Sequence, residues 1–125
     1  MHPRRSGAVL LDVVAIGALA VAASAFGVSV VSGGSMEPAL ARGDLVLYRK
    51  GPGQVGSGRM VLLGTPRGEY VHRVVVRTAR ETILTRGDAN PIADREETSV
   101  AAVRGTVVAV VPSGRLFPRL AASRR

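Results

Sequence analysis

The feature that most constrains this chain is an apolar run near its N-terminus. Residues 7–31 form a stretch of 25 residues with one charge, Asp12, and residues 13–31 carry none. At a helical rise of 1.5 Å per residue, residues 13–31 would span roughly 28 Å, close to the ~30 Å hydrocarbon thickness of a bilayer. We therefore expect residues 7–31 to form a single transmembrane helix in contact with the lipid bilayer, behind a short basic flank at residues 1–6.

A cleavable signal peptide is the alternative interpretation of the same run. Arg4 and Arg5 would form its basic start, and the small residues 22–25 would precede the cut. The uncharged run continues to Val31, which is long for a signal peptide and favours a permanent anchor. Because basic residues gather on the cytoplasmic side of membrane helices, Arg4 and Arg5 predict a cytoplasmic N-terminus and a C-terminal domain outside the plasma membrane.

The composition of the 125 residues excludes several kinds of site. There is no cysteine, which excludes a disulfide framework, a cysteine-ligated zinc site and a thiol nucleophile. The two histidines, His2 and His72, argue against a multi-histidine metal site, and we expect neither a metal nor an organic cofactor. A net charge of +8 raises the question of nucleic acid, but the chain has no basic run of five residues and no interleaved aromatics. We therefore expect no nucleic-acid partner.

Residues 32–114 show the pattern of a small β domain. Short β-branched or aliphatic runs are separated by Gly and Pro clusters, which is typical of strands joined by turns. The expected strands lie at residues 45–48, 60–63, 70–76, 82–85 and 100–111. No helical period of useful length follows Val31, and residues 115–125 are expected to form a loose basic tail. The predicted fold class is therefore mainly β, with one N-terminal transmembrane helix.

A candidate nucleophile, Ser35, stands just after the apolar run. The two glycines before it allow a tight turn and Pro38 restricts the chain around it, so this loop can present a hydroxyl. A serine nucleophile needs a base, and His72 is the only histidine after the apolar run. Strand alternation places His72 on one apolar face with residues 70, 74 and 76. Each residue also has an ordinary interpretation, Ser35 as part of a linker and His72 as a core residue.

Two acidic residues, Asp88 and Asp94, follow the next expected strand on a loop that contains Gly and Pro. An aspartate beside a histidine base fixes the tautomer of the ring and stabilises its charged form. Either carboxylate could turn inward toward His72. In the ordinary interpretation, Asp88 forms an Asx turn and Asp94 is a surface charge beside Arg95.

Four segments, taken in order, resemble the motifs of type I signal peptidases. They are Ser35-Met-Glu-Pro38, Arg42-Gly-Asp44, His72-Arg-Val-Val75, and the stretch from Arg86-Gly-Asp-Ala-Asn90 through Asp94. The match in order and spacing covers about residues 28–111. Bacterial housekeeping members of the family carry a lysine in the base motif. The histidine here is similar to the branch found in the endoplasmic reticulum, in archaea and in sporulating bacteria.

The resemblance implies both a fold and a mechanism. The fold would be a signal-peptidase-like β catalytic domain at the outer surface of the membrane. The activity would be that of a serine endopeptidase cutting signal peptides from exported preproteins after small residues. The resemblance makes Ser35 the nucleophile, with its N–H helping to form the oxyanion hole, and makes His72 the general base. Asp94 would complete the triad, and Asp88 would be a nearby supporting acid.

Two departures from the family pattern concern Gly33 and Arg59. Gly33 replaces the serine that usually stands two residues before the nucleophile, so that side chain adds no hydroxyl to the oxyanion hole. Arg59 follows Gly58, at a position where members of the family often have an acidic residue. The main alternative function is a catalytically inactive membrane-anchored adaptor of the same fold. A self-cleaving regulator with a lysine base is another alternative, but Lys50, the only lysine, is poorly placed. The residues name neither the substrate range nor any accessory subunits.

Overall fold

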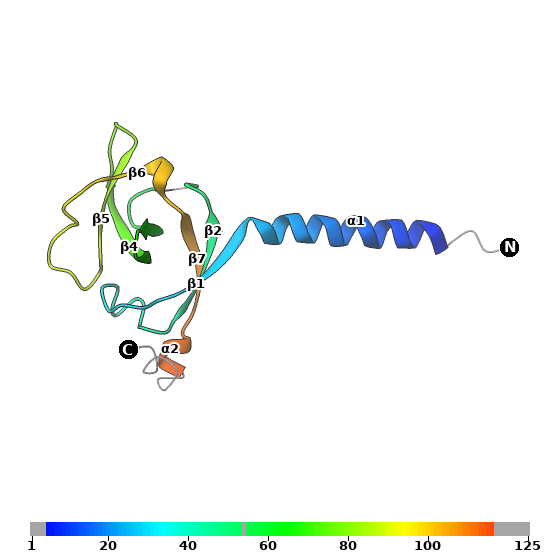
Figure 1. Ribbon diagram of the computed structural model, residues 1–125, viewed down its shortest axis with the longest axis horizontal. Coiled ribbons are helices and arrows are strands. Elements are labelled where there is room, and N and C mark those ends of the chain that lie inside the picture. The colour runs from blue at the N-terminus through cyan, green and yellow to red at the C-terminus, as the bar shows by residue number, and fades with distance from the viewer. Residues whose placement is uncertain (1–4, 54, 117–125) are drawn as a thin grey trace.

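A long N-terminal helix leads into a curled antiparallel sheet in the computed structural model, which describes residues 5–53 and 55–116 (Figure 1). The helix α1 spans Arg5–Ser24. The strands are β1 (Phe26–Val30), β2 (Leu45–Lys50), β3 (Met60–Thr65), β4 (Gly68–Arg77), β5 (Thr82–Arg86), β6 (Thr98–Ser99) and β7 (Gly105–Val111). Two short helical turns are η1 (Val100–Ala102) and α2 (Ser113–Leu116). Most of the expected basic flank and basic tail lies outside the described residues.

The strands form one sheet in the order β1-β2-β7-β3-β4-β5-β6, and all of its neighbouring pairs are antiparallel. The prediction of a mainly β fold with one N-terminal apolar helix is therefore confirmed. The register shifts between Leu47 and Tyr48 on β2 and between Val74 and Val76 on β4. Irregularities of this kind bend a strand and increase its twist, which fits the curl seen in Figure 1.

The helix ends earlier than the apolar run predicts, at Ser24 rather than at Val31. Its segment Gly7–Ser24 has a mean hydropathy of 2.1 and is long and apolar enough to cross a membrane. At 1.5 Å per residue, that segment spans about 27 Å. The rest of the predicted 7–31 span is not helical and belongs mainly to the sheet.

Residues 26–30 form β1 instead of a further helical turn. Their sequence alternates large apolar residues with glycine and serine, and β1 pairs with β2 from Phe26↔Arg49 to Val30↔Leu45. Gly27 lies under the ring of Tyr48, where a Cβ would approach the ring carbon Cζ to 2.4 Å. Glycine is unfavourable inside a helix, and this close approach requires it in the strand.

The run at residues 100–111 forms η1 and β7 rather than the single strand that its composition predicts. Val100 and Val103 lie three residues apart and are both buried in the core. Three residues make one turn of a 3₁₀ helix, so the turn brings both side chains to the same side. β7 begins only after this turn, at Gly105.

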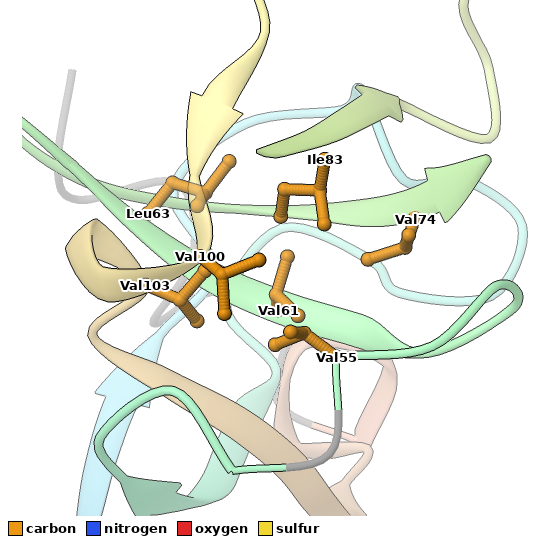
Figure 2. Packing of buried hydrophobic residues seen from close by; sticks show 7 residues of the cluster. All are labelled: Val55, Val61, Leu63, Val74, Ile83, Val100 and Val103. Carbon is orange, nitrogen blue, oxygen red and sulfur yellow. The ribbon is translucent and has the colours of Figure 1, made fainter. Parts of the chain in front are cut away.

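Two core clusters hold the sheet together. The first contains Val55, Val61, Leu63, Val74, Ile83, Val100 and Val103, shown in Figure 2. The second contains Met36, Leu40, Val46, Leu62, Val71 and Val107. Neighbouring residues of β3 and β4 enter different clusters, because successive side chains of a strand point to opposite faces. Each fully buried aliphatic side chain stabilises the fold by about 1.5–3 kcal/mol.

The segment between β1 and β2 is fastened to the sheet by a buried carboxylate. Asp44 is 0% exposed, and its side chain accepts hydrogen bonds from the N–H of Ala41 at 2.9 Å and of Gly114 at 3.0 Å. The Val31 N–H donates to the Asp44 carbonyl at 2.8 Å and closes the base of the segment. Both carboxylate oxygens therefore have a partner, and Asp44 of the Arg42-Gly-Asp44 motif has a structural role here.

Candidate active site

A serine, a histidine and an aspartate from three separate segments meet beside β4. Ser35 lies in the turn between β1 and β2, His72 on β4, and Asp94 in the loop between β5 and β6. The Ser35 Oγ lies 3.2 Å from Nε2 of His72, and Nδ1 of His72 lies 2.7 Å from Oδ2 of Asp94. His72 is 8% exposed. In this arrangement one ring nitrogen can take the hydroxyl proton while the carboxylate orients the other.

Ser35 is held mainly through its backbone and its neighbour. The side chain of Met36 is buried in the second core cluster, and the Ser35 carbonyl accepts the Ala89 N–H at 2.9 Å. Gly87 passes so close that a Cβ there would lie 2.5 Å from the Ser35 carbonyl oxygen. A side chain at position 87 would therefore displace either the serine or the loop that carries Asp94.

Asp94 is held by Thr85, a residue that the sequence reasoning missed. The Thr85 Oγ1 donates to Oδ2 of Asp94 at 2.5 Å, and the Asp94 N–H donates to the Thr85 carbonyl at 2.8 Å. The carboxylate oxygen that contacts His72 thus also accepts the threonine hydroxyl. Thr85 is 1% exposed and pairs with Val74 of β4. The sequence carries one signal that could have found it, because Thr85 is a polar residue at an inward position of the alternating strand β5.

An aromatic ring covers one side of the histidine. The rings of Tyr70 and His72 pack edge to face, with centroids 4.8 Å apart. Burial raises the pKa of the Tyr70 phenol, and the charge of Asp94 raises it further. The phenol therefore remains protonated at neutral pH. Simple alternation predicts that Val76 shares this face, and that prediction is wrong. The register shifts after Val74, and Val76 is 44% exposed.

Asp88 contacts the opposite face of β4 rather than the histidine. Its two carboxylate oxygens accept hydrogen bonds from Nε and Nη2 of Arg73, both at 2.8 Å. Arg73 also donates from Nη1 to the Gly58 carbonyl at 2.9 Å. Since residues 72 and 73 are successive on a strand, the histidine and the arginine point to opposite sides. The loop after β5 therefore supplies one carboxylate to each face.

The Arg73–Asp88 ion pair should make the free energy of unfolding depend on pH in the acidic range. Its hydrogen bonds hold the pKa of Asp88 below the ordinary value of about 3.9. The stabilisation is complete above that value and is lost as the pH falls through the lower folded-state value. Arg73 is 35% exposed in its side chain, so solvent screens the pair to about 1 kcal/mol or less.

The measurement is thermal unfolding of the wild-type protein and of Asp88→Asn, from neutral pH down to a pH below the folded-state pKa of Asp88. At neutral pH the wild-type protein should unfold at the higher temperature, and the difference should vanish in acid. A difference that stays constant with pH would show that the pair does not contribute in this way.

A small pocket adjoins Ser35. It has a volume of about 100 Å³, and its walls include Val31, Gly33, Leu62 and Val71. A broader groove of about 530 Å³ shares lining residues with it and runs along β1 and the β3–β4 hairpin. A Cβ at Gly33 would meet no atom of the described residues within 4 Å, so the fold leaves room for a serine there.

The only lysine lies at the wrong end of β1 to serve Ser35. Lys50 is exposed, and its N–H donates to the Ala25 carbonyl at 2.7 Å, where α1 joins β1. Ser35 follows the opposite end of β1. This placement counts against the alternative with a lysine base.

Compared with protein-family models and with curated proteins, the chain matches none. The contacts among Ser35, His72 and Asp94 and the order of the motifs are therefore what bear on the function of this chain.

Proposed function

We propose that this protein is a membrane-anchored serine endopeptidase that removes signal peptides from exported preproteins. The observation that carries the proposal is the hydrogen-bonded series Ser35–His72–Asp94 beside a small pocket with mostly apolar walls. This series supports a nucleophilic serine. The resemblance to signal peptidases narrows the reaction to signal-peptide cleavage.

The proposed reaction begins when the Ser35 Oγ attacks the scissile carbonyl carbon. His72 takes the hydroxyl proton on Nε2, and the new C–O bond leaves a negative charge on the former carbonyl oxygen. The Ser35 N–H would stabilise this oxyanion. Collapse breaks the C–N bond, and His72 donates its proton to the leaving amine of the mature protein. Water then attacks the acyl-serine by the same route and releases the signal peptide with a free carboxylate.

The pocket and the helix support this class of substrate. A pocket of about 100 Å³ with mostly apolar walls beside Ser35 has room for a small side chain before the cut, alanine included. The helix α1 would anchor the enzyme in the plasma membrane as a single span, with the N-terminus cytoplasmic. The β domain would then lie on the outer face, where the scissile bond of a signal peptide emerges.

The test is cleavage of a panel of exported precursors by the full chain in membranes, with the N-termini of the products sequenced. A chelator is present throughout, because the mechanism needs no metal. New N-termini that follow small residues, and that are absent from membranes without this protein, would support the proposal. A folded, inserted protein that cuts no precursor would favour the inactive adaptor instead.

A further inference from the structure

Thr85 contributes a second hydroxyl to the hydrogen-bonded series, at the end opposite to Ser35. Its Oγ1 lies 2.5 Å from Oδ2 of Asp94, and that oxygen lies 2.7 Å from Nδ1 of His72. An ionised carboxylate only accepts hydrogen bonds, so the threonine hydroxyl donates. One carboxylate oxygen therefore accepts both a hydroxyl proton and a ring N–H, and the series gains a member behind the aspartate.

The hydroxyl is buried at a position where the core asks only for an apolar side chain. Thr85 is 1% exposed and shares the inner face of β5 with Ile83, which is buried in the first core cluster. Valine has the same branched shape and carries no polar atom. Burying a hydroxyl costs free energy unless it is hydrogen-bonded, and within the described residues the Thr85 hydroxyl has one partner, Asp94. Its contact with the carboxylate, rather than packing, accounts for a threonine here.

The Asp94 carboxylate needs this contact to keep its orientation. Its side chain is 24% exposed and belongs to a loop rather than to a strand. The last torsion of an aspartate has broad minima, so the carboxylate turns easily. The bond from the Asp94 N–H to the Thr85 carbonyl, at 2.8 Å, holds the loop but not that torsion. The threonine hydroxyl supplies the missing constraint, because it keeps Oδ2 on the side of the ring.

The orientation of Oδ2 decides where the neutral ring of His72 carries its proton. One nitrogen of a neutral imidazole donates and the other accepts, and the hydrogen bond made by one nitrogen sets the role of the other. With Oδ2 facing Nδ1, the proton stays on Nδ1, and Nε2 keeps a lone pair toward the Ser35 hydroxyl at 3.2 Å. A carboxylate that turned away would leave both tautomers accessible, and fewer molecules could accept the serine proton.

We propose that Thr85 is a positioning residue: its hydroxyl holds the Asp94 carboxylate against His72 and so keeps the ring proton on Nδ1. The buried threonine does not reach the substrate and acts through Asp94 alone. The kinetic consequence of this role rests on the proposed peptidase function, whereas the position of the ring proton does not.

The test compares two substitutions at position 85 with a matched control, all in the full chain. Thr85→Val removes the hydroxyl and keeps the branched shape, and Thr85→Ser keeps the hydroxyl. The control is Thr106→Val, because Thr106 is a 7% exposed threonine on β7 whose Oγ1 has no hydrogen-bond partner among the described residues. Thermal unfolding of each variant checks that the fold is intact.

On a precursor that the wild-type protein cleaves, Thr85→Val should lower kcat by about 10- to 100-fold with little change in KM, because a displaced catalytic group slows the chemical step. Thr85→Ser and Thr106→Val should stay within several-fold of the wild-type rate. Added to Asp94→Asn, Thr85→Val should cost little more, since it acts only through that carboxylate. Equal losses in Thr85→Val and Thr106→Val, or additive losses in the double variant, would show a purely structural role and overturn the proposal.

The ring tautomer gives a measurement that needs no substrate. His2→Gln leaves His72 as the only histidine, so nitrogen NMR shifts of the labelled ring show which nitrogen carries the proton at a pH where the ring is neutral. We expect Nδ1 in the wild-type background, in Thr85→Ser and in Thr106→Val, and a share on Nε2 in Thr85→Val. This result without cleavage of any precursor would count against the peptidase function but support the positioning role. An unchanged tautomer in Thr85→Val would overturn the positioning role, whatever the kinetics.

Discussion

Ser35→Ala should abolish precursor cleavage, lowering kcat/KM by about 10³-fold or more. The substitution removes the attacking oxygen and little else. The hydroxyl contacts Nε2 of His72, whereas the turn is held by the buried side chain of Met36 and by the bond from Ala89 to the Ser35 carbonyl. Folding and membrane insertion should therefore be unchanged, which thermal unfolding and membrane fractionation would check.

A matched control stands three residues earlier. Ser32 is exposed and lines the same pocket, so Ser32→Ala makes the same chemical change without touching His72. We expect Ser32→Ala to retain cleavage. If Ser35→Ala kept normal activity, or if both variants lost it equally, Ser35 would not be the nucleophile.

The contact between Ser35 and His72 also predicts how substitutions of these two residues combine. Residues that act as one catalytic unit show strongly non-additive effects, because removing either member already removes the reaction path. His72→Gln keeps a side chain of similar size under the ring of Tyr70, and the double variant with Ser35→Ala should be no slower than either single variant.

The sequence pattern predicts the strands better than the end of the helix. β2, β3, β4 and β5 follow alternating or β-branched runs between turns, and the structure has them close to the expected positions. β1 continues an apolar run whose hydropathy does not distinguish helix from strand. Its identity depends on pairing with β2 and on the Tyr48 ring over Gly27, two contacts that only the folded chain contains.

The candidate site also contains residues that the sequence predicts and residues that only the structure reveals. Ser35, His72 and Asp94 carry chemistry that a motif can indicate, and the structure brings them within hydrogen-bonding distance. Thr85 and Gly87 act through a buried hydroxyl and a close backbone approach. Thr85 is marked locally only as a polar residue at an inward position of an alternating strand, and Gly87 is an ordinary loop glycine whose close approach to Ser35 no local pattern marks.

The residues alone leave the choice between Asp88 and Asp94 open, the family resemblance assigns Asp94 to the triad, and the fold brings Asp94 within hydrogen-bonding distance of His72. The two residues share one loop, and either could serve a histidine by composition. The structure brings Asp94 to His72 and Asp88 to Arg73 because successive residues of β4 face opposite ways. Their substitution by asparagine should therefore have different consequences, although the chemical change is the same.

Asp94→Asn should lower kcat by about 10³- to 10⁴-fold with little change in KM. The amide carries no charge to stabilise the protonated ring of His72. If its nitrogen faces Nδ1, the ring proton moves to Nε2 and the base toward Ser35 is lost. The Thr85 hydroxyl, which contacts the same side-chain atom, would then accept an amide N–H instead of donating, and the backbone bond from residue 94 to the Thr85 carbonyl would remain, so the loop should stay in place. Steady-state kinetics on a precursor that the wild-type protein cleaves would measure kcat and KM, and thermal unfolding would check that the fold is unchanged.

Asp88→Asn supplies the comparison within the same loop. It breaks the ion pair with Arg73, which should cost about 1 kcal/mol of stability or less at neutral pH, while the Ser35–His72–Asp94 contacts remain. Cleavage by this variant should therefore stay within several-fold of the wild-type rate. Equal losses of kcat in the two variants would mean that Asp88 also acts on His72. A small effect of Asp94→Asn would mean that the 2.7 Å contact between Asp94 and His72 is not needed for the reaction.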